Sequence, residues 1–522
     1  MSFKIFSCLN NFLHQVSPPD ELTNPARAKS GWSLYLILAG VATTLGSSVP
    51  VGYNIGVVNT PAEVIRNFCN ESIMSRFDVT LNETSMNILW SSIVSIFIVG
   101  GCTGSVLGAY CANTLGRKRA TILTSFLSLF GASLFLMCRA CNSVEMLILG
   151  RLLVGLASGL TTSVVPMYLT ELSPLALTGA MGVLCPMGVN VGVFIGQFMG
   201  LNFLLGGDDN WPYLLSVYAV IVLICLPVLI ILPESPKYLY LVKGNEDKSL
   251  KELRRLRGAA SQLLAEDIDI LRDEERANQV AALSGDKAWS MMRVLKEKKL
   301  RLPLLLTCSM QAGQQTSGIN AVFYYSQTIF KQGGLSVQSS QYATIGCGFI
   351  NVCTAILMLY LLPRVGRRPL LLGSIFSASI LLACLAASNY IISFQDLLPW
   401  MPYMCMIFVL LYVLVYGFGL GPIPYFIASE MFEVAPRPAG MAWGSLANWS
   451  GNFLIGMCFP TMRELIGPYS FIVFAAITAA LFLFQKMYFP ETQGRTPTQV
   501  YQLCSHGLRS RPLLESANES PL

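Results

Sequence analysis

Amide side chains recur inside the long apolar stretches of this 522-residue chain. One stretch holds Gln314, Gln315 and Asn320, and a later one holds Asn448 and Asn452, four residues apart and so on one helix face. An amide both donates and accepts hydrogen bonds, which suits a neutral ligand rich in hydroxyl groups. One such residue could equally bond a neighbouring helix. For the whole set we expect a polar cavity, because buried amides need partners or water.

The elements that must position these amides are membrane helices. The chain is 53 % hydrophobic, only 12 % charged, and has a mean hydropathy of +0.55. A bilayer core needs about 20 apolar residues per helix. Twelve candidate spans lie near 32–57, 88–111, 120–138, 146–169, 180–203, 213–232, 302–328, 342–362, 369–388, 401–427, 440–461 and 469–488. The sequence predicts an all-α membrane protein, with its tenth helix interrupted by the Gly/Pro run 419–424.

Two basic clusters, Gly116-Arg117-Lys118-Arg119 and Gly366-Arg367-Arg368, divide the chain into related halves. Carboxylates recur with them, since Glu171 corresponds to Glu430, and Glu234 to Glu491. The simplest interpretation of such clusters is positive-inside anchoring. Their repetition favours a latch that ties helix ends together and switches during a cycle. The candidate latch residues are Arg117, Lys118, Glu171, Glu234, Arg367, Arg368, Glu430, Arg437 and Glu491.

The predicted organisation follows from these halves. A cytoplasmic N-terminus (1–31) precedes the first six-helix bundle (32–232), a helical cytoplasmic linker (233–301), the second bundle (302–489) and a cytoplasmic tail (490–522). Basic loops on one side predict that both termini are cytoplasmic. The opposite loop, 59–87, carries glycosylation sequons at Asn70 and Asn82. The net charge of +6 is sorted by loop, so we expect the lipid bilayer rather than nucleic acid as a partner. The scattered cysteines and two histidines predict no metal site, and no oligomeric state is assigned.

Several longer motifs resemble the facilitative glucose transporters, in the sugar-porter branch of the major facilitator superfamily. They run in order from about Gly46 to Thr496. These motifs are Gly52-Tyr53-Asn54, Gly150-Arg151, Pro166-Met167-Tyr168-Leu169-Thr170-Glu171, Pro233-Glu234-Ser235-Pro236, Gln314-Gln315-Thr316-Ser317-Gly318-Ile319-Asn320, Gly421-Pro422-Ile423-Pro424-Tyr425 and Pro490-Glu491-Thr492.

The resemblance implies a non-enzymatic, cofactor-free uniporter for a hexose, foremost D-glucose, in the plasma membrane. It implies sugar contacts at or beside the amides, an outer aromatic gate that includes Phe323, and Tyr425 where a Trp is usual. The predicted substrate-binding residues are Gln314, Gln315, Ile319, Asn320, Phe323, Asn351, Tyr425, Asn448 and Asn452.

The chain also departs from the family pattern. Pro186 replaces a Gln in helix five, Gly417 replaces an acidic residue, and Pro363 precedes the second basic cluster where an acid is common. Transport of fructose or another neutral polyol-like solute is therefore an alternative, and a sugar sensor without flux is a second one. Asn54 stands where proton-coupled relatives carry Asp opposite Arg151, which favours facilitated diffusion. The plain alternative for Arg151 is a side chain that snorkels to the interface beside Glu145.

Overall fold

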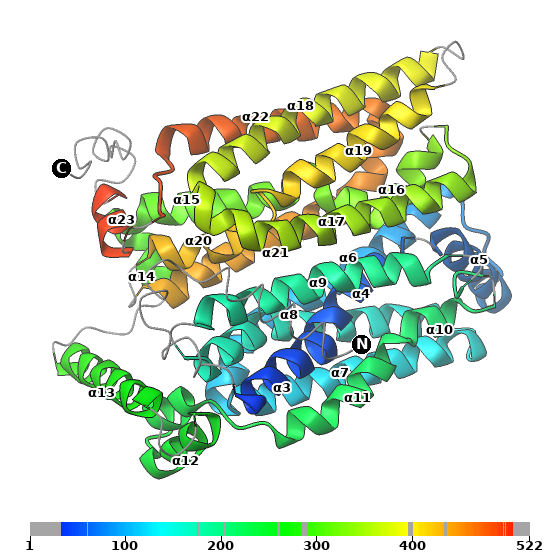
Figure 1. Ribbon diagram of the computed structural model, residues 1–522. Helices are drawn as coiled ribbons and strands as arrows, with labels where there is room; N and C mark the ends of the chain where they lie inside the picture. The colour runs from blue at the N-terminus through cyan, green and yellow to red at the C-terminus, as the bar shows by residue number, and fades with distance from the viewer. Residues whose placement is uncertain are drawn as a thin grey trace, which may run out of the picture.

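The computed structural model is helical throughout the part of the chain that it describes, with no strand there (Figure 1). The described residues are 33–59, 61–174, 177–201, 204–207, 209–257, 262–283, 291–332, 334–394, 400–432, 436–493, 495 and 497–504. The predicted N-terminal segment 1–31 lies outside them, as do residues 505–522 of the predicted tail 490–522.

The first half contains six spans. The first consists of α3 (Leu34–Thr43) and α4 (Val49–Gly56), joined by the π-turn η2 (Thr44–Ser48), and α5 (Ala62–Phe77) follows it outside the bundle. The others are α6 (Glu83–Thr114), α7 (Arg117–Ala140), α8 (Val144–Leu172), α9 (Thr178–Met199), and α10 (Trp211–Ser216) with α11 (Tyr218–Ile231). Side chains cap several helix starts: Asn82 accepts a hydrogen bond from the Ser85 N–H at 2.8 Å, which begins α6 earlier than hydropathy predicts.

The second half repeats this plan. Its spans are α15 (Arg301–Gln314) with η6 (Gln315–Ile319) and α16 (Asn320–Gln332), α17 (Val337–Val365), α18 (Arg367–Phe394), α19 (Met401–Gly417) with α20 (Ile423–Met431), α21 (Arg437–Ile466) and α22 (Ser470–Tyr488). The short turn η7 (Gly467–Tyr469) separates the last two, and α23 (Pro497–Cys504) follows.

The predicted twelve-helix membrane fold is confirmed. By length and hydropathy, nine described helical segments could span a membrane, and one of them, Ala439–Tyr488, contains most of α21 and all of α22. The seventh and tenth spans complete the set, although both are interrupted. The break in the tenth, between α19 and α20, lies at the predicted Gly/Pro run. The break in the seventh was not predicted: a π-turn there places Gly318 at φ 93°.

The linker consists of α12 (Glu246–Arg257), α13 (Gln262–Leu283), α14 (Met291–Lys296) and the turn η5 (Lys298–Leu300), with the π-turn η4 (Tyr238–Val242) before it. It contacts both halves. Arg255 of α12 lies over the Tyr35 ring of α3 at 4.4 Å, and Trp443 of α21 donates a hydrogen bond to the Met291 carbonyl of α14 at 2.9 Å.

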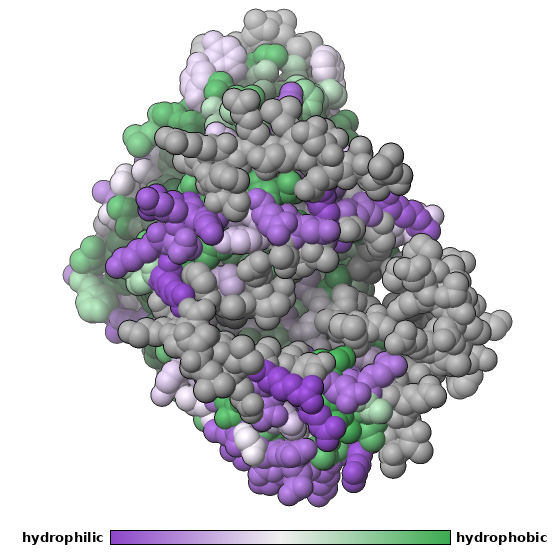
Figure 2. Space-filling model, turned by 90° about the vertical axis from the view of Figure 1, so that its left-hand side faces the viewer, coloured by the Kyte–Doolittle hydropathy of each residue, from purple (hydrophilic) through white to green (hydrophobic). Residues whose placement is uncertain are grey.

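The linker helices and α23 lie at one end of the molecule and α5 at the other (Figure 1). We call these the linker end and the α5 end. The face at the linker end gathers many hydrophilic side chains (Figure 2). Between the ends, helices approach closely through small residues: a Cβ on Gly155 of α8 would lie 2.0 Å from the Phe97 carbonyl oxygen of α6. The halves meet where α6 packs along α21 and α9 along α17.

Candidate functional site

A chain of amides connects α15, α21 and the break in the tenth span. Asn448 donates to the Gln311 and Gln314 side-chain oxygens at 2.8 and 2.6 Å. Gln314 in turn donates to the Leu420 carbonyl at 3.1 Å, and Gln311 donates to the Pro424 carbonyl at 2.8 Å. A broken helix leaves carbonyls without helical partners, and here the amides satisfy them.

The chain continues through the π-turn of the seventh span. Gln315 donates to the Gln314 side-chain oxygen at 3.0 Å, and Asn320 donates to Gln315. The π-turn lets residues 314, 315 and 320 meet, because it inserts an extra residue into the helix. Gly318 is required at this turn, since a Cβ there would lie 2.6 Å from the Phe474 ring.

The other predicted substrate-binding residues are distributed around this network. Asn452 is buried one turn after Asn448 on α21. Ile319 and Phe323, within the seventh span, are buried in the hydrophobic core. Tyr425 on α20 is instead 51 % exposed. Asn351 of α17 does not join the network: it donates to Asn190 of α9, in the other half, at 3.2 Å. Sugar contact by these residues stays a prediction.

Two amides of this region were missed by sequence reasoning. Gln311 lies three residues before Gln314, so helical spacing could have placed it on the same face. Asn190 lies on the same face of α9 as Pro186, four residues away, but only the fold brings it to Asn351. Neither belongs to the motifs that carried the resemblance.

Arg151 is fully buried inside the first half, so the interpretation of a side chain that snorkels to the interface is wrong. Its guanidinium donates to the backbone carbonyl of Asn54 at 2.8 Å and lies over the Phe97 ring at 4.5 Å. Glu145, the companion considered for it, pairs with Arg76 at 2.7 Å instead.

Polar contacts tie the halves together at the α5 end. Asn59, after α4, donates to the Phe323 carbonyl at 3.0 Å and to the Ser326 hydroxyl at 2.6 Å. Lys331 of α16 pairs with Glu63 of α5 at 2.7 Å. Asn87 of α6 donates to Glu464 of α21 at 3.2 Å. The structure therefore has its α5 end closed.

At the linker end, one charge cluster lies in the first half. The Arg117 guanidinium pairs with Glu171 at 2.9 Å, and Glu171 also accepts from the Ser235 hydroxyl. Glu234 accepts from the Lys118 backbone N–H at 3.0 Å. Gly116 has φ 99°, and a Cβ there would lie 2.4 Å from the Glu234 carboxylate. Burial raises the pKa of the Glu234 carboxyl above its ordinary value, although backbone N–H donors act against this rise.

The second half repeats this cluster position by position. Arg367 pairs with Glu430 at 3.1 Å, Glu430 accepts from the Thr492 hydroxyl, and Glu491 accepts from the Arg367 backbone N–H at 3.0 Å. Gly366 has φ 89°, and a Cβ there would lie 2.8 Å from Glu491. The clusters thus link the start of the third helix of each half, at Arg117 or Arg367, to the segments at the ends of the fourth and sixth helices.

Two predicted latch residues, Lys118 and Arg368, differ from simple ion pairs. Lys118 and Arg368 contribute their backbone N–H groups to Glu234 and Glu491, and the Arg368 guanidinium donates to the Lys486 carbonyl at 2.9 Å. Arg437 begins α21, but its side chain lies outside the described part of the structure.

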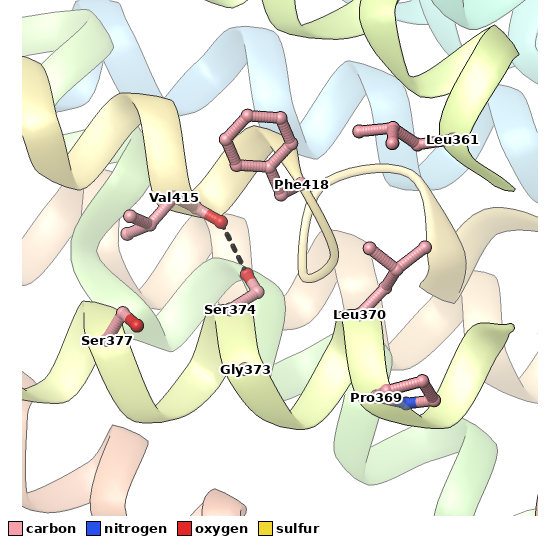
Figure 3. Close-up of a pocket in the computed structure, with 8 residues that line it drawn as sticks. All are labelled: Leu361, Pro369, Leu370, Gly373, Ser374, Ser377, Val415 and Phe418. Carbon is pink, nitrogen blue, oxygen red and sulfur yellow. Dashed lines mark hydrogen bonds between the residues drawn. The ribbon is translucent and has the colours of Figure 1, made fainter. Parts of the chain in front are cut away.

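A cavity of about 320 Å³ lies next to the break in the tenth span, between α17, α18 and the end of α19 (Figure 3). Its lining is mainly apolar and contains none of the predicted site residues. Ser374, on its wall, donates to the Val415 carbonyl at 2.7 Å and accepts from the Leu420 N–H at 3.0 Å. The cavity therefore borders the end of α19 rather than the amide network.

Comparison with known proteins identifies the family. Residues 39–503 match the family model described as sugar (and other) transporter. The chain is 37 % identical over 461 residues to facilitated glucose transporter member 1 of solute carrier family 2 from Gallus gallus, covering 88 % of this chain and 91 % of the relative. It is 38 % identical over 466 residues to member 3 from Ovis aries, with the same coverages.

Solved structures agree at the level of the fold. The proton:xylose symporter XylE bound to 6-bromo-6-deoxy-D-glucose superposes with a TM-score of 0.71 at 21 % identity, covering 90 % of this chain and 99 % of that one. XylE from E. coli in a partially occluded inward-open conformation superposes with a TM-score of 0.70 at 20 % identity, covering 88 % and 100 %. The family model covers most of the chain, and the relatives are 37 % and 38 % identical over 88 % of it. The chain therefore belongs to the sugar (and other) transporter family.

Proposed function

We propose that the protein carries a hexose, foremost D-glucose, across the plasma membrane by facilitated diffusion. The observation that carries this proposal is the network of Gln311, Gln314, Gln315, Asn320 and Asn448, since amides match the paired donors and acceptors of sugar hydroxyls. The curated relatives named above are facilitated glucose transporters, which supports the same substrate. The protein is a transporter and not an enzyme.

Uniport is favoured over proton coupling by the surroundings of Arg151. Coupling needs a titratable group that changes environment during the cycle. In the first span, Asn54 contacts Arg151 through its backbone carbonyl, and the Asn54 amide does not titrate. Uphill hexose uptake driven by an imposed proton gradient would contradict the proposal.

We propose that the linker end faces the cytoplasm and that the α5 end faces the outside. The two charge clusters then act as cytoplasmic latches that hold the helix ends of each half during rocking. Asn70 and Asn82 would lie outside as glycan acceptors, and Asn82 is exposed at the start of α6. In this orientation the structure is closed to the outside.

Uptake by proteoliposomes tests the proposal. The purified protein should equilibrate labelled D-glucose faster than fructose, and Gln315→Ala and Asn320→Ala should both slow this uptake. Gln485→Ala is a matched control, because that buried amide of α22 bonds Ser309 at 2.9 Å outside the network. Normal transport by both network variants would overturn the site assignment. Preferred uptake of fructose would favour the alternative substrate, and sugar binding without flux would favour a sensor.

A further inference from the structure

One face of α9 carries polar groups that meet the other half of the protein. Asn190 and Gln197 lie seven residues apart, two helical turns, and therefore on the same face. Along this face α9 packs on α17 in antiparallel order. Gln197 of α9 lies against Gly348 of α17, where an added Cβ would be 2.3 Å from the Gln197 side-chain oxygen. Next to them, the ring centroids of Phe194 of α9 and Phe349 of α17 are 6.1 Å apart.

The Asn190–Asn351 hydrogen bond lies next along this seam towards the linker end. One turn further in that direction, α9 presents Pro186, which has no side-chain donor or acceptor. Asn190 is therefore the amide that α9 offers at the inner end of the seam, on the side away from the closed α5 end. A solute held between the halves would meet it there.

The pair keeps unused hydrogen-bonding capacity. Their mutual bond uses the Asn351 Nδ2 and the Asn190 Oδ1. The Asn190 Nδ2 and the Asn351 Oδ1 have no partner among the described residues, and neither is enclosed away from solvent. If both amides were turned over, the pair would still present one free donor and one free acceptor. A hydroxyl group accepts one hydrogen bond and donates another, so one sugar hydroxyl fits this pair.

We propose that Asn190 is a specificity-determining residue that, together with Asn351, holds one particular hydroxyl of the transported hexose. The inference rests on the proposed function and adds to it a contact from the first half of the chain. The other amides described at the site all come from the second half. Because Asn190 moves with the first half, this hydroxyl is held from both sides while the α5 end is closed.

A panel of sugars tests the inference. Competition by D-glucose and its monodeoxy analogues against labelled glucose is measured in proteoliposomes for the parent protein and Asn190→Val. Loss of one net hydrogen bond corresponds to a change of about 2- to 12-fold in affinity. We expect Asn190→Val to bind glucose several-fold more weakly. We also expect one monodeoxy analogue to bind the variant as well as glucose does, although the parent distinguishes the two.

Gln197→Leu is the matched control. This amide lies on the same helix face, is fully buried, and has both side-chain polar atoms without partners among the described residues. Its replacement changes the seam but should change the affinity of every sugar by one common factor. Asn351→Val should remove discrimination at the same hydroxyl as Asn190→Val, which also provides a second route if one variant folds poorly.

A uniform change across the panel in Asn190→Val, as in Gln197→Leu, would overturn the inference, because Asn190 would then only join the halves. If instead Asn190→Val and Asn351→Val lose discrimination at two different hydroxyls, the shared contact is refuted. Absence of hexose binding in the parent protein would overturn the proposed function and this inference with it. Intact parental transport separates the two failures.

Discussion

Replacing Asn59 by Ala should open the α5 end. The Asn59 side chain is 1 % exposed and donates two hydrogen bonds across the halves, to Phe323 and Ser326. Neither bond can persist once the halves separate at this end. At about 0.5–1.5 kcal/mol net for each bond, their loss costs the closed arrangement about 1–3 kcal/mol. That is a shift of about 5- to 150-fold in the equilibrium between the two arrangements.

Hydrogen–deuterium exchange measured by mass spectrometry detects this shift without labels. In Asn59→Ala, peptides from residues 56–66 and 320–332 should exchange faster, and peptides at the linker end of α20 and α21 should exchange more slowly. The reciprocal pattern distinguishes a population shift from local loosening. Asn389→Ala is the control, since Asn389 is equally buried but bonds Leu385 and Arg463 within the second half. Two results would refute the reasoning. One is faster exchange at both the α5 end and the linker end of the Asn59→Ala protein. The other is faster exchange at the α5 end together with slower exchange at the linker end in the Asn389→Ala control.

Three further outcomes are expected. Gly366→Ala should lower both transport and thermal stability, because Gly366 has φ 89° and an added Cβ would lie 2.8 Å from the Glu491 carboxylate. Gly373→Ala is the control: its added Cβ would meet nothing within 4 Å, so this variant should match the parent in uptake and melting assays. Glu234 has a raised pKa in the folded protein, so its stabilising contribution is present below its ordinary value of 4.5 and is lost as pH rises through the raised value. The melting temperature of Glu234→Gln relative to the parent should therefore increase with pH above about 4.5; a constant difference would contradict this. Gln311→Leu removes an acceptor from Asn448 and a donor from Pro424, and should raise the KM for glucose uptake about 2- to 12-fold; an unchanged KM would exclude Gln311 from the site.

Much of the fold follows from hydropathy and charge. Apolar length predicts twelve spans, and the basic clusters identify two halves, because membrane helices need about 20 apolar residues and basic residues collect at one side. Pro and Gly at 419–424 predict the break in the tenth span. The π-turn in the seventh was not predictable in this way, since it depends on Gly318 packing against Phe474 from a distant helix.

The presence of buried amides at the candidate site was predictable from the sequence, but their hydrogen-bond partners were not. Amides in apolar segments indicate a polar interior, yet spacing does not reveal that Gln311 and Gln314 bond the carbonyls of the broken tenth span. It also does not reveal that Asn351 meets Asn190, because such pairs arise only from the way the halves dock. Sequence left open whether Arg151 was buried, and tertiary packing against Asn54 and Phe97 decided it.

The bonds from Gln314 to the broken tenth span have a kinetic consequence. If Gln314 binds sugar hydroxyls as proposed, the sugar competes with the Leu420 and Gly421 carbonyls for the same amide donors. We therefore expect an occupied carrier to cross between its two orientations over a different barrier from an empty one. Unlabelled hexose on the far side of the membrane should then change the rate at which labelled hexose crosses, so that exchange and net flux have different maximal velocities.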